Sequence, residues 1–356
     1  MFGQALALIL YIAAQGISFA LGGAAVISAS VIGGVALQTL ITSGNRLFGG
    51  MRRLRRDYVG LLVMLTMLIL GGYLQTTNVP YADYKITWFG LAVVMGTLAA
   101  LRGVNSKEML LAMVGVNGLL LLQYLSVFGS RDWILIGETY QYLSLIAGFC
   151  AVYWLNRTDK LTWWGAALAA LNIFVLLNSG SRTPLLGVGA VLLYQSLFNR
   201  DARPLLLIAA ASAIALTYVD YTEFRLFQRL SYLSEDTLDG SSLARLDFWQ
   251  LTLDAPQTFF SSLFGHGTGM WPANILSSDE GYPHNIFLEF FYEHGLLGLL
   301  VMGYVTYLLL SARNSVFKYL GLYFLVFLQL SGGLESMRWF MLFFALALHH
   351  TGENEA

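Results

Sequence analysis

The stretch 284–311, HNIFLEFFYEHGLLGLLVMGYVTYLLLS, decides the fold. It exceeds the roughly 20 mostly apolar residues that a helix needs to cross the hydrocarbon core of a bilayer. Comparable apolar stretches recur along the chain and predict about twelve spans, at residues 3–20, 22–42, 58–77, 86–102, 108–128, 136–155, 161–178, 184–198, 204–219, 284–311, 317–334 and 337–350. We therefore expect an all-α polytopic membrane protein in which residues 1–356 form a single integral membrane domain.

The composition of the chain also indicates a membrane protein. Of its 356 residues, 57% are hydrophobic and only 12% are charged, whereas about 25% of the residues of a soluble domain are charged. The mean hydropathy is +0.63. A soluble core could not bury this much apolar side chain, so lipid must be the solvent for most of the chain. Cys150 is the single cysteine, which excludes a disulfide within the chain.

The Lys and Arg residues of the short loops are unevenly distributed between the two ends of the spans. Loops at one end hold thirteen: Arg46, Arg52, Arg53, Arg55, Arg56, Arg102, Lys107, Arg157, Lys160, Arg200, Arg203, Arg313 and Lys318. Loops at the other end hold four: Lys85, Arg131, Arg182 and Arg338. Because cytoplasmic loops are enriched in basic residues, we expect both termini in the cytoplasm and the second set on the outer side.

One hydrophilic segment, 220–283, interrupts the apolar pattern. Its acidic residues outnumber Arg225, Arg229 and Arg245; they are Asp220, Glu223, Glu235, Asp236, Asp239, Asp247, Asp254, Asp279 and Glu280. The charge rule places this segment on the outer side, and its end runs directly into the span at 284–311. We therefore expect one long, partly helical outer loop that carries the chemistry at the water–lipid boundary.

The first candidate site lies in the outer turn N178-S-G-S-R-T-P184. Pro184 suits the first turn of the following helix, where a missing N–H has no consequence. Arg182 is then close to the free N–H groups of a helix N-terminus, and the two together favour a phosphate site. The alternative is an arginine that anchors a helix end at the membrane surface.

The second candidate is S241-S-L-A-R-L-D-F-W-Q-L251. Ser242 could cap a helix, because the apolar residues Leu246, Trp249 and Leu253 follow it at helical spacing. Arg245 would then project from an amphipathic helix that lies along the membrane surface. The alternative for Arg245 is an ion pair with Asp247 or another acidic neighbour.

The segment S262-L-F-G-H-G-T-G269 contains three glycines in five residues and the side chain of His266. Such a segment resembles a phosphate-cradling loop, but no strand precedes it and no Lys-Ser/Thr pair follows it. We therefore interpret it as a tight turn.

The fourth candidate is Y282-P-H-N-I-F-L-E289, which continues to E293-H-G-L-L-G298. His284 lies at the outer start of a span, where a neutral imidazole can act as a general base. Asn285 could orient this imidazole or contact sugar hydroxyls. The alternative for His284 is a residue that caps a helix at the membrane interface.

Two pairs of charged residues, each four apart, flank this region. Glu289 and Glu293 share one helix face inside a span, where a carboxylate needs a function or a partner. Arg225 and Arg229 form a basic pair at the entrance of the long loop, with ion pairs to Asp220 and Glu223 as the alternative.

The sequence contains no constellation of metal ligands. His266, His284 and His294 do not have the HxxxH spacing, and no acidic pair lies in a short outer loop. We expect no divalent-metal requirement and no cofactor.

Taken in order, the pieces SGSRTP, RLxxW, LFGxG and HNxxLExxxExGLxG resemble the superfamily of O-antigen ligases and Wzy O-antigen polymerases, which are bacterial envelope glycosyltransferases. The resemblance covers residues 178–298, about a third of the chain. It implies a GT-C-like enzyme of the bacterial inner membrane whose loop 220–283 and active face are periplasmic. It also implies undecaprenyl-pyrophosphate-linked glycans as substrates, contacts with membrane lipids and a chain-length regulator protein, and no nucleic-acid partner.

Carried over by motif, the resemblance implies that Arg182 and Arg245 hold the pyrophosphate and that His284 activates the acceptor hydroxyl. The side chains expected around the substrate are Ser181, Arg225, Arg229, His266, Asn285 and Glu289. His266 departs from the family pattern, which more often has a small aliphatic residue here, so it is either a second polar contact or without a role.

The residues of this site can provide the chemistry that the reaction needs. Arginines can stabilise a pyrophosphate leaving group without a metal, and one base can deprotonate a sugar hydroxyl. Direct displacement would invert the anomeric carbon and needs no ATP. We expect a polymerase of lipid-linked repeat units. The alternatives are an O-antigen ligase, which transfers the glycan to lipid A–core, and, from a different class, a transporter or flippase.

Overall fold

The computed structural model describes residues 56–104, 106–127, 140–157, 162–179, 181–200, 205, 240–279, 281–334 and 337–349. The expected spans at 3–20, 22–42 and 204–219 lie outside these residues, as do Arg225 and Arg229. Regular secondary structure in the described part is entirely helical, which confirms the all-α prediction for this part of the chain.

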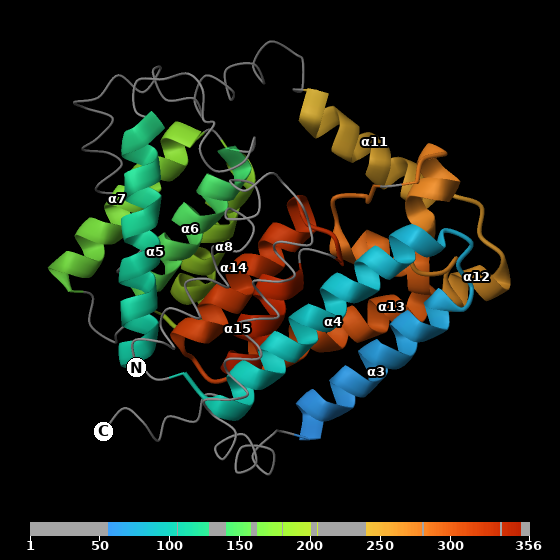
Figure 1. The fold of residues 1–356 in the computed structure, drawn as a ribbon, viewed down its shortest axis with the longest axis horizontal. Helices are drawn as coiled ribbons and strands as arrows, with labels where there is room; N and C mark the ends of the chain where they lie inside the picture. Colours follow the sequence, from blue (N-terminus) through green and yellow to red (C-terminus); the bar gives the residue numbers. More distant parts are fainter. Residues whose placement is uncertain are drawn as a thin grey trace.

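The helices follow one another in the order shown in Figure 1. They are α3 (Arg56–Tyr73), α4 (Val79–Arg102), α5 (Ser106–Val127), α6 (Tyr140–Asn156), α7 (Trp163–Ser179), α8 (Arg182–Phe198), α11 (Gly240–Asp254), α12 (Phe259–Phe264), the π-helical turn η4 (Pro272–Leu276), α13 (Ile286–Ser311), α14 (Val316–Leu330) and α15 (Met337–His349). By length and composition, α3, α4 and α13 can cross a membrane, and α7, α14 and α15 are shorter apolar helices. The count of about twelve spans stays a prediction.

Two helix starts differ from those predicted. The span expected at 86–102 begins at Val79, with Pro80 in its first turn, so Lys85 lies inside α4 rather than in an outer loop. The charge of Lys85 lowers the hydropathy of the stretch before residue 86, so the predicted span began after it. The other is α11, which begins at Gly240, so Ser242 lies within the helix and is not its N-cap.

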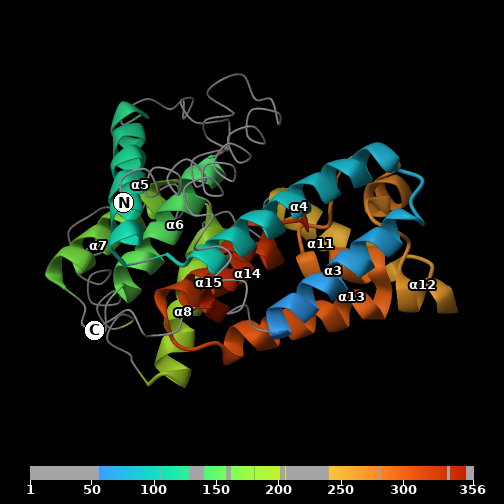
Figure 2. The ribbon, with the colours of Figure 1, turned by 60° about the horizontal axis from the view of Figure 1, so that its bottom comes forward.

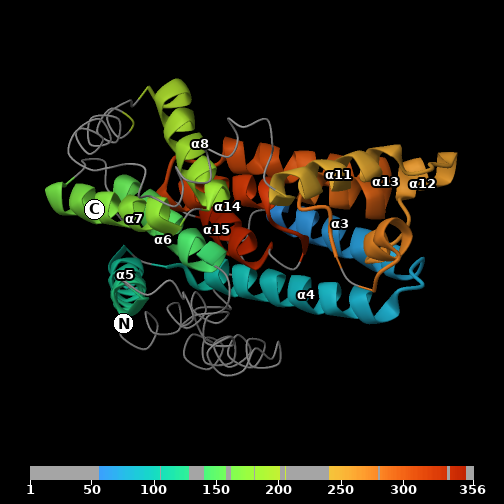
Figure 3. The same cartoon turned by 90° about the horizontal axis from the view of Figure 1, so that it is seen from above.

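Helix α15 forms the centre of the molecule. Nearly all of its residues are buried, as expected of a helix that is apolar on every side. It packs between α4 and α14, and α14 in turn contacts α6 and α8. Figures 1 and 2 show α14 and α15 between the group α5–α8 and the group formed by α3, α4 and α13. In the second group, α3 packs against both α4 and α13, as Figure 3 shows from above.

Small residues allow these helices to approach closely. A Cβ atom on Gly96 of α4 would lie 2.7 Å from the backbone oxygen of Met341 in α15. Gly148 of α6 and Gly187 of α8 both face the ring of Tyr323, whose hydroxyl donates to the Leu145 carbonyl over 2.8 Å. Such close packing is typical of helices that associate within a membrane.

Helix α13 is not the uninterrupted span that the sequence predicted, because it breaks at Gly295 (φ 64°, ψ −155°). The Gly-rich turn at residues 262–269 packs against the backbone at this break. The backbone N–H groups of His266 and Gly267 donate to the carbonyls of Tyr292 and Glu293, over 2.9 and 3.0 Å. These N–H groups are therefore used by the protein itself, which supports a tight turn and argues against a phosphate cradle.

Candidate functional site

His284 lies in the turn that leads into α13, and neighbouring elements hold the backbone that precedes it. The Tyr81 hydroxyl of α4 donates to the carbonyl of Gly281 over 2.8 Å. The Trp249 indole N–H of α11 donates to the carbonyl of Pro283 over 2.9 Å. His284 itself has φ 56°, a conformation that a non-glycine residue keeps only where the surrounding structure enforces it.

Helix α11 brings the side chains of Arg245, Phe248 and Trp249 to this turn. Its position is fixed by Trp271, whose ring N–H donates to the Thr252 hydroxyl over 2.8 Å. Phe248 contacts both Trp271, at 5.4 Å between ring centroids, and His284, at 6.2 Å. Arg245, one helical turn before Trp249, is close enough for its charge to act on the imidazole of His284.

Burial and Arg245 together set the protonation of His284. Burial lowers the pKa of His284 most, the positive charge of Arg245 lowers it further, and a hydrogen bond to the backbone of Ser331 raises it, so that the pKa is about 4. The imidazole is therefore neutral near pH 7, as a general base must be. Its Nδ1 is buried and has no hydrogen-bond partner among the described residues.

Ser331 links His284 to the start of α8. Its backbone bonds the imidazole, and its hydroxyl lies 2.9 Å from the hydroxyl of Thr183. Thr183 follows Arg182, the first residue of α8. The structure thus brings together the turn that holds His284, the helix that carries Arg245, and the helix start that carries Arg182.

Asn285 and Ser181, next to His284 and Arg182, both lie at N-cap positions of helices. The side-chain oxygen of Asn285 accepts the N–H groups of Phe287 and Leu288, over 3.0 and 3.1 Å, and so caps α13. This oxygen therefore caps the helix, and a role of Asn285 in orienting the imidazole or contacting sugar hydroxyls stays a prediction. Ser181 is buried at the N-cap position of α8, where its side chain makes no capping bond.

The structure does not bring His266 into contact with His284. Its ring stacks on Tyr292, at 4.5 Å between centroids, about two turns into α13. Burial lowers the pKa of His266. His266 therefore belongs to the turn that fills the break in α13.

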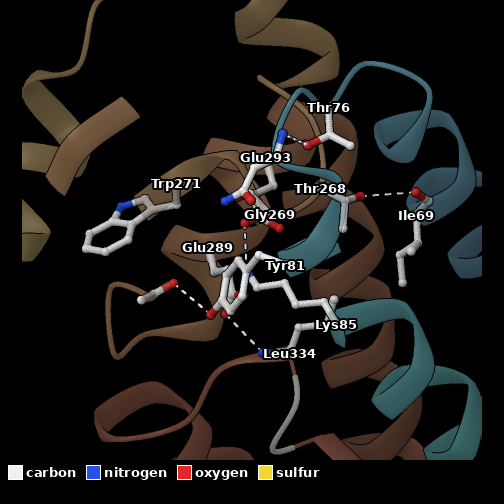
Figure 4. A network of polar contacts seen from close by, with 12 residues as sticks. Ile69, Thr76, Tyr81, Lys85, Thr268, Gly269, Trp271, Glu289, Glu293 and Leu334 are labelled. Carbon is white, nitrogen blue, oxygen red and sulfur yellow. Dashed lines mark hydrogen bonds and ion pairs between the residues drawn. The ribbon is translucent and has the colours of Figure 1, made fainter. Parts of the chain in front are cut away.

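Glu289 and Glu293 pair with Lys85, a partner that sequence reasoning missed. The Lys85 ammonium lies 2.5 Å from Glu289 Oε1 and 2.6 Å from Glu293 Oε1, and all three side chains are at most 1% exposed. Figure 4 shows them between α4 and α13, with Lys85 4.9 Å from the centroid of the Tyr81 ring. The available signal was the pair of carboxylates itself, since two acids in an apolar span require a cation.

Parts of the chain are similar to known proteins. Residues 167–303 match the Wzy_C family, described as O-antigen ligase. The match contains Arg182, Arg245, His284 and Glu289. The chain is also 26% identical over 251 residues to the exopolysaccharide production protein ExoQ of Rhizobium meliloti (strain 1021), covering 60% of this chain and 55% of ExoQ.

The chain thus matches about half the length of this curated relative. The family match covers α8, α11 and the first part of α13, and the relative is named for exopolysaccharide production. The family match is to O-antigen ligase, and it confirms the resemblance to the superfamily of O-antigen ligases and Wzy-like proteins that the motifs predicted.

Proposed function

We propose that the protein is a glycosyltransferase of the bacterial inner membrane that polymerises undecaprenyl-pyrophosphate-linked oligosaccharide repeat units at the periplasmic face. One observation carries the proposal. The imidazole of His284 lies within the field of Arg245 and bonds Ser331, whose hydroxyl contacts Thr183 beside Arg182. A base and two guanidinium groups on three separate elements can thus serve one substrate.

In the proposed reaction, His284 removes the proton from a hydroxyl of the acceptor sugar. The hydroxyl oxygen attacks the anomeric carbon of the donor glycan, and the bond from this carbon to the pyrophosphate oxygen breaks. The configuration at the anomeric carbon inverts, and undecaprenyl pyrophosphate leaves with the bonding electron pair. Arg182 and Arg245 stabilise its negative charge through forked hydrogen bonds. The imidazolium then releases its proton to solvent.

The low pKa of His284 fits this sequence of events. A free site with pKa about 4 keeps the imidazole neutral, but such a base is weak. A bound diphosphate would neutralise Arg245 and place negative charge near the imidazole, and both effects raise the pKa of His284. The base would therefore become stronger when the donor is bound, which favours proton transfer in the complex.

An O-antigen ligase is the second candidate, because the matching family is described by that name. The relative, named for exopolysaccharide production, is consistent with either activity. Deleting the gene in its host separates the two. Loss of a polymerase leaves single repeat units on the surface lipid, whereas loss of a ligase leaves none.

The direct test uses the purified protein in lipid nanodiscs with synthetic lipid-linked repeat units and no nucleotide. We expect longer glycans from the wild type, and at least about a 100-fold loss of rate in Arg182→Ala, Arg245→Ala and His284→Ala, the scale of losing a general base. Arg157→Ala is the control, because Arg157 is exposed at the end of α6 and contacts Trp154. Full activity in any of the three variants would remove that residue from the mechanism, and glycan movement without elongation would indicate a transporter.

A further inference from the structure

The two buried carboxylates of α13 share Lys85 but face different segments. Glu289 uses Oε1 for Lys85, and its Oε2 accepts the backbone N–H of Leu334 over 3.0 Å. Glu293 also uses Oε1 for Lys85 and bonds the backbone of Gly269 in the Gly-rich turn. Figure 4 shows the Leu334 bond to Glu289. One acid is therefore tied to the segment 331–334, between α14 and α15, and the other to the turn that fills the break in α13.

The segment 331–334 is the one that bonds His284. Ser331 provides the backbone bond to the imidazole and the hydroxyl contact to Thr183. Its own N–H is used by the carbonyl of Phe327, at the end of α14. Three residues later, the N–H of Leu334 is held by a buried carboxylate. This short segment is thus fixed at both ends, and its bond to His284 depends on where those ends lie.

We propose that Glu289 is a positioning residue for His284 and does not itself contact the substrate. Lys85 holds the carboxylate of Glu289 in place, Glu289 fixes the N–H of Leu334, and the segment 331–334 then presents Ser331 to the imidazole. This inference rests on the proposed function, and it replaces the substrate-binding role expected for Glu289 from the sequence.

A glutamine substitution has different effects at Glu289 and at Glu293. In Glu289→Gln only one oxygen remains, and the ammonium of Lys85 attracts it more strongly than the amide of Leu334. The side-chain NH2 group would then face the N–H of Leu334, so that two donors meet and the bond is lost. Glu293→Gln loses a carboxylate beside the same lysine but leaves Leu334 bonded to Glu289. The second variant is therefore the matched control for the first.

The test measures elongation kinetics and amide hydrogen exchange on the full chain in nanodiscs. For Glu289→Gln we expect kcat to fall about 10- to 100-fold with KM within about twofold, since a misplaced catalytic group slows the reaction on this scale. For Glu293→Gln we expect kcat within about threefold of the wild type. Exchange should accelerate in the peptide that contains Leu334 only in the first variant, and in the peptide that contains Gly269 only in the second.

Glu289→Asp is a second variant that tests the same inference if Glu289→Gln does not fold. The aspartate keeps the charge beside Lys85 but is one methylene shorter, so it cannot reach both Lys85 and Leu334. We expect the same loss of kcat and the same faster exchange at Leu334.

Three results would overturn the inference: equal kcat losses in Glu289→Gln and Glu293→Gln, a higher KM with unchanged kcat in Glu289→Gln, or unchanged exchange at Leu334. A wild-type protein that does not elongate glycans would instead reject the proposed function, while the exchange data would still test the bond from Glu289 to Leu334.

Discussion

At the scale of single residues, the site combines a base of low pKa with a nearby permanent cation. A buried histidine beside an arginine is a poor base in isolation, since both effects favour its neutral form. The same arrangement becomes useful if the substrate is an anion, because the anion reverses the effect of the arginine. Under the proposed function, the charge of Arg245 therefore favours a diphosphate over a neutral sugar as the ligand beside His284.

This argument predicts a difference between two pH profiles. A base works in its deprotonated form, so the rate is full above the pKa of His284 and falls as the pH drops through it. For kcat/KM, which reports the free enzyme, the half-maximal rate should lie near the pKa of about 4. For kcat, which reports the complex, it should lie at a higher pH, because the bound diphosphate raises the pKa of His284.

Arg245→Lys and Arg245→Gln are the controls for these profiles. Lysine keeps the charge, so the acid limb of kcat/KM should stay near that of the wild type, although the rate falls because an ammonium cannot grip two oxygens in a fork. Glutamine removes the charge, and the acid limb of its residual activity should move to higher pH. Coincident limbs for kcat and kcat/KM in the wild type would contradict the argument.

Sequence patterns predicted where the polar motifs lie but not how their side chains pair. His284 and Arg245 were predicted to face one site, and the structure places them close enough for the charge of Arg245 to act on the imidazole. Lys85 was missed because its partners are more than 200 residues away along the chain. The cap made by Asn285 was likewise not predicted, since an asparagine at a helix start suits a cap and a ligand contact equally.

At the scale of elements, the break in α13 is the feature that positions the Gly-rich turn. Hydropathy gave no sign of it, because Gly295 lies in an apolar stretch that reads as one span. The break depends on two glycines that have no room for a side chain. A Cβ atom on Gly295 would lie 2.4 Å from the backbone of Leu263, and one on Gly265 would lie 2.2 Å from the backbone of Glu293.

We therefore predict that Gly295→Ala strongly destabilises the protein. The φ and ψ of Gly295 fall in a region essentially limited to glycine, where another residue costs about 1–3 kcal/mol. The steric overlap with the backbone of Leu263 adds about 1–3 kcal/mol. The unfolding temperature in nanodiscs, followed by circular dichroism, should drop clearly.

Gly303→Ala in the same helix is the matched control. A Cβ atom on Gly303 would meet no other atom within 4 Å, and this glycine has ordinary helical geometry. Alanine there should leave the unfolding temperature unchanged or raise it, since glycine is less favourable than alanine inside a helix by about 0.5–1 kcal/mol. Equal unfolding temperatures for the two variants would show that the break is not required by the fold.

At the scale of the whole molecule, the helix ends are sorted into two groups. One group holds the starts of α4, α8 and α13 with the ends of α3 and α14, joined by bonds such as those of Tyr81 to Gly281 and Thr183 to Ser331. The other group joins the end of α8 to the start of α14 and the segment before it, where Asn199 contacts Tyr319 and Asn314. The candidate site lies entirely in the first group.

The charge bias that predicted the topology depends on which basic residues lie in loops. Lys85 and Arg338, which the sequence assigned to outer loops, are buried inside α4 and α15. They are therefore not loop charges, and the bias toward basic residues in the other loops becomes stronger. Lys318, assigned to an inner loop, caps the end of α13 by donating to the carbonyls of Leu310 and Ala312, over 2.7 and 2.9 Å.

The sidedness of the two groups can be tested by labelling single cysteines. Gln257 and Asn314 are both exposed, one in the segment between α11 and α12 and the other between α13 and α14. In a Cys150→Ala background, which removes the buried native thiol, we expect a membrane-impermeant maleimide to react with Gln257→Cys in intact spheroplasts. Asn314→Cys should react only after the membrane is permeabilised, because basic residues cluster in loops on the cytoplasmic side. Labelling of Asn314→Cys in intact spheroplasts, with Gln257→Cys protected, would reverse the orientation and place the base and its arginines in the cytoplasm, where a periplasmic polymerase cannot operate.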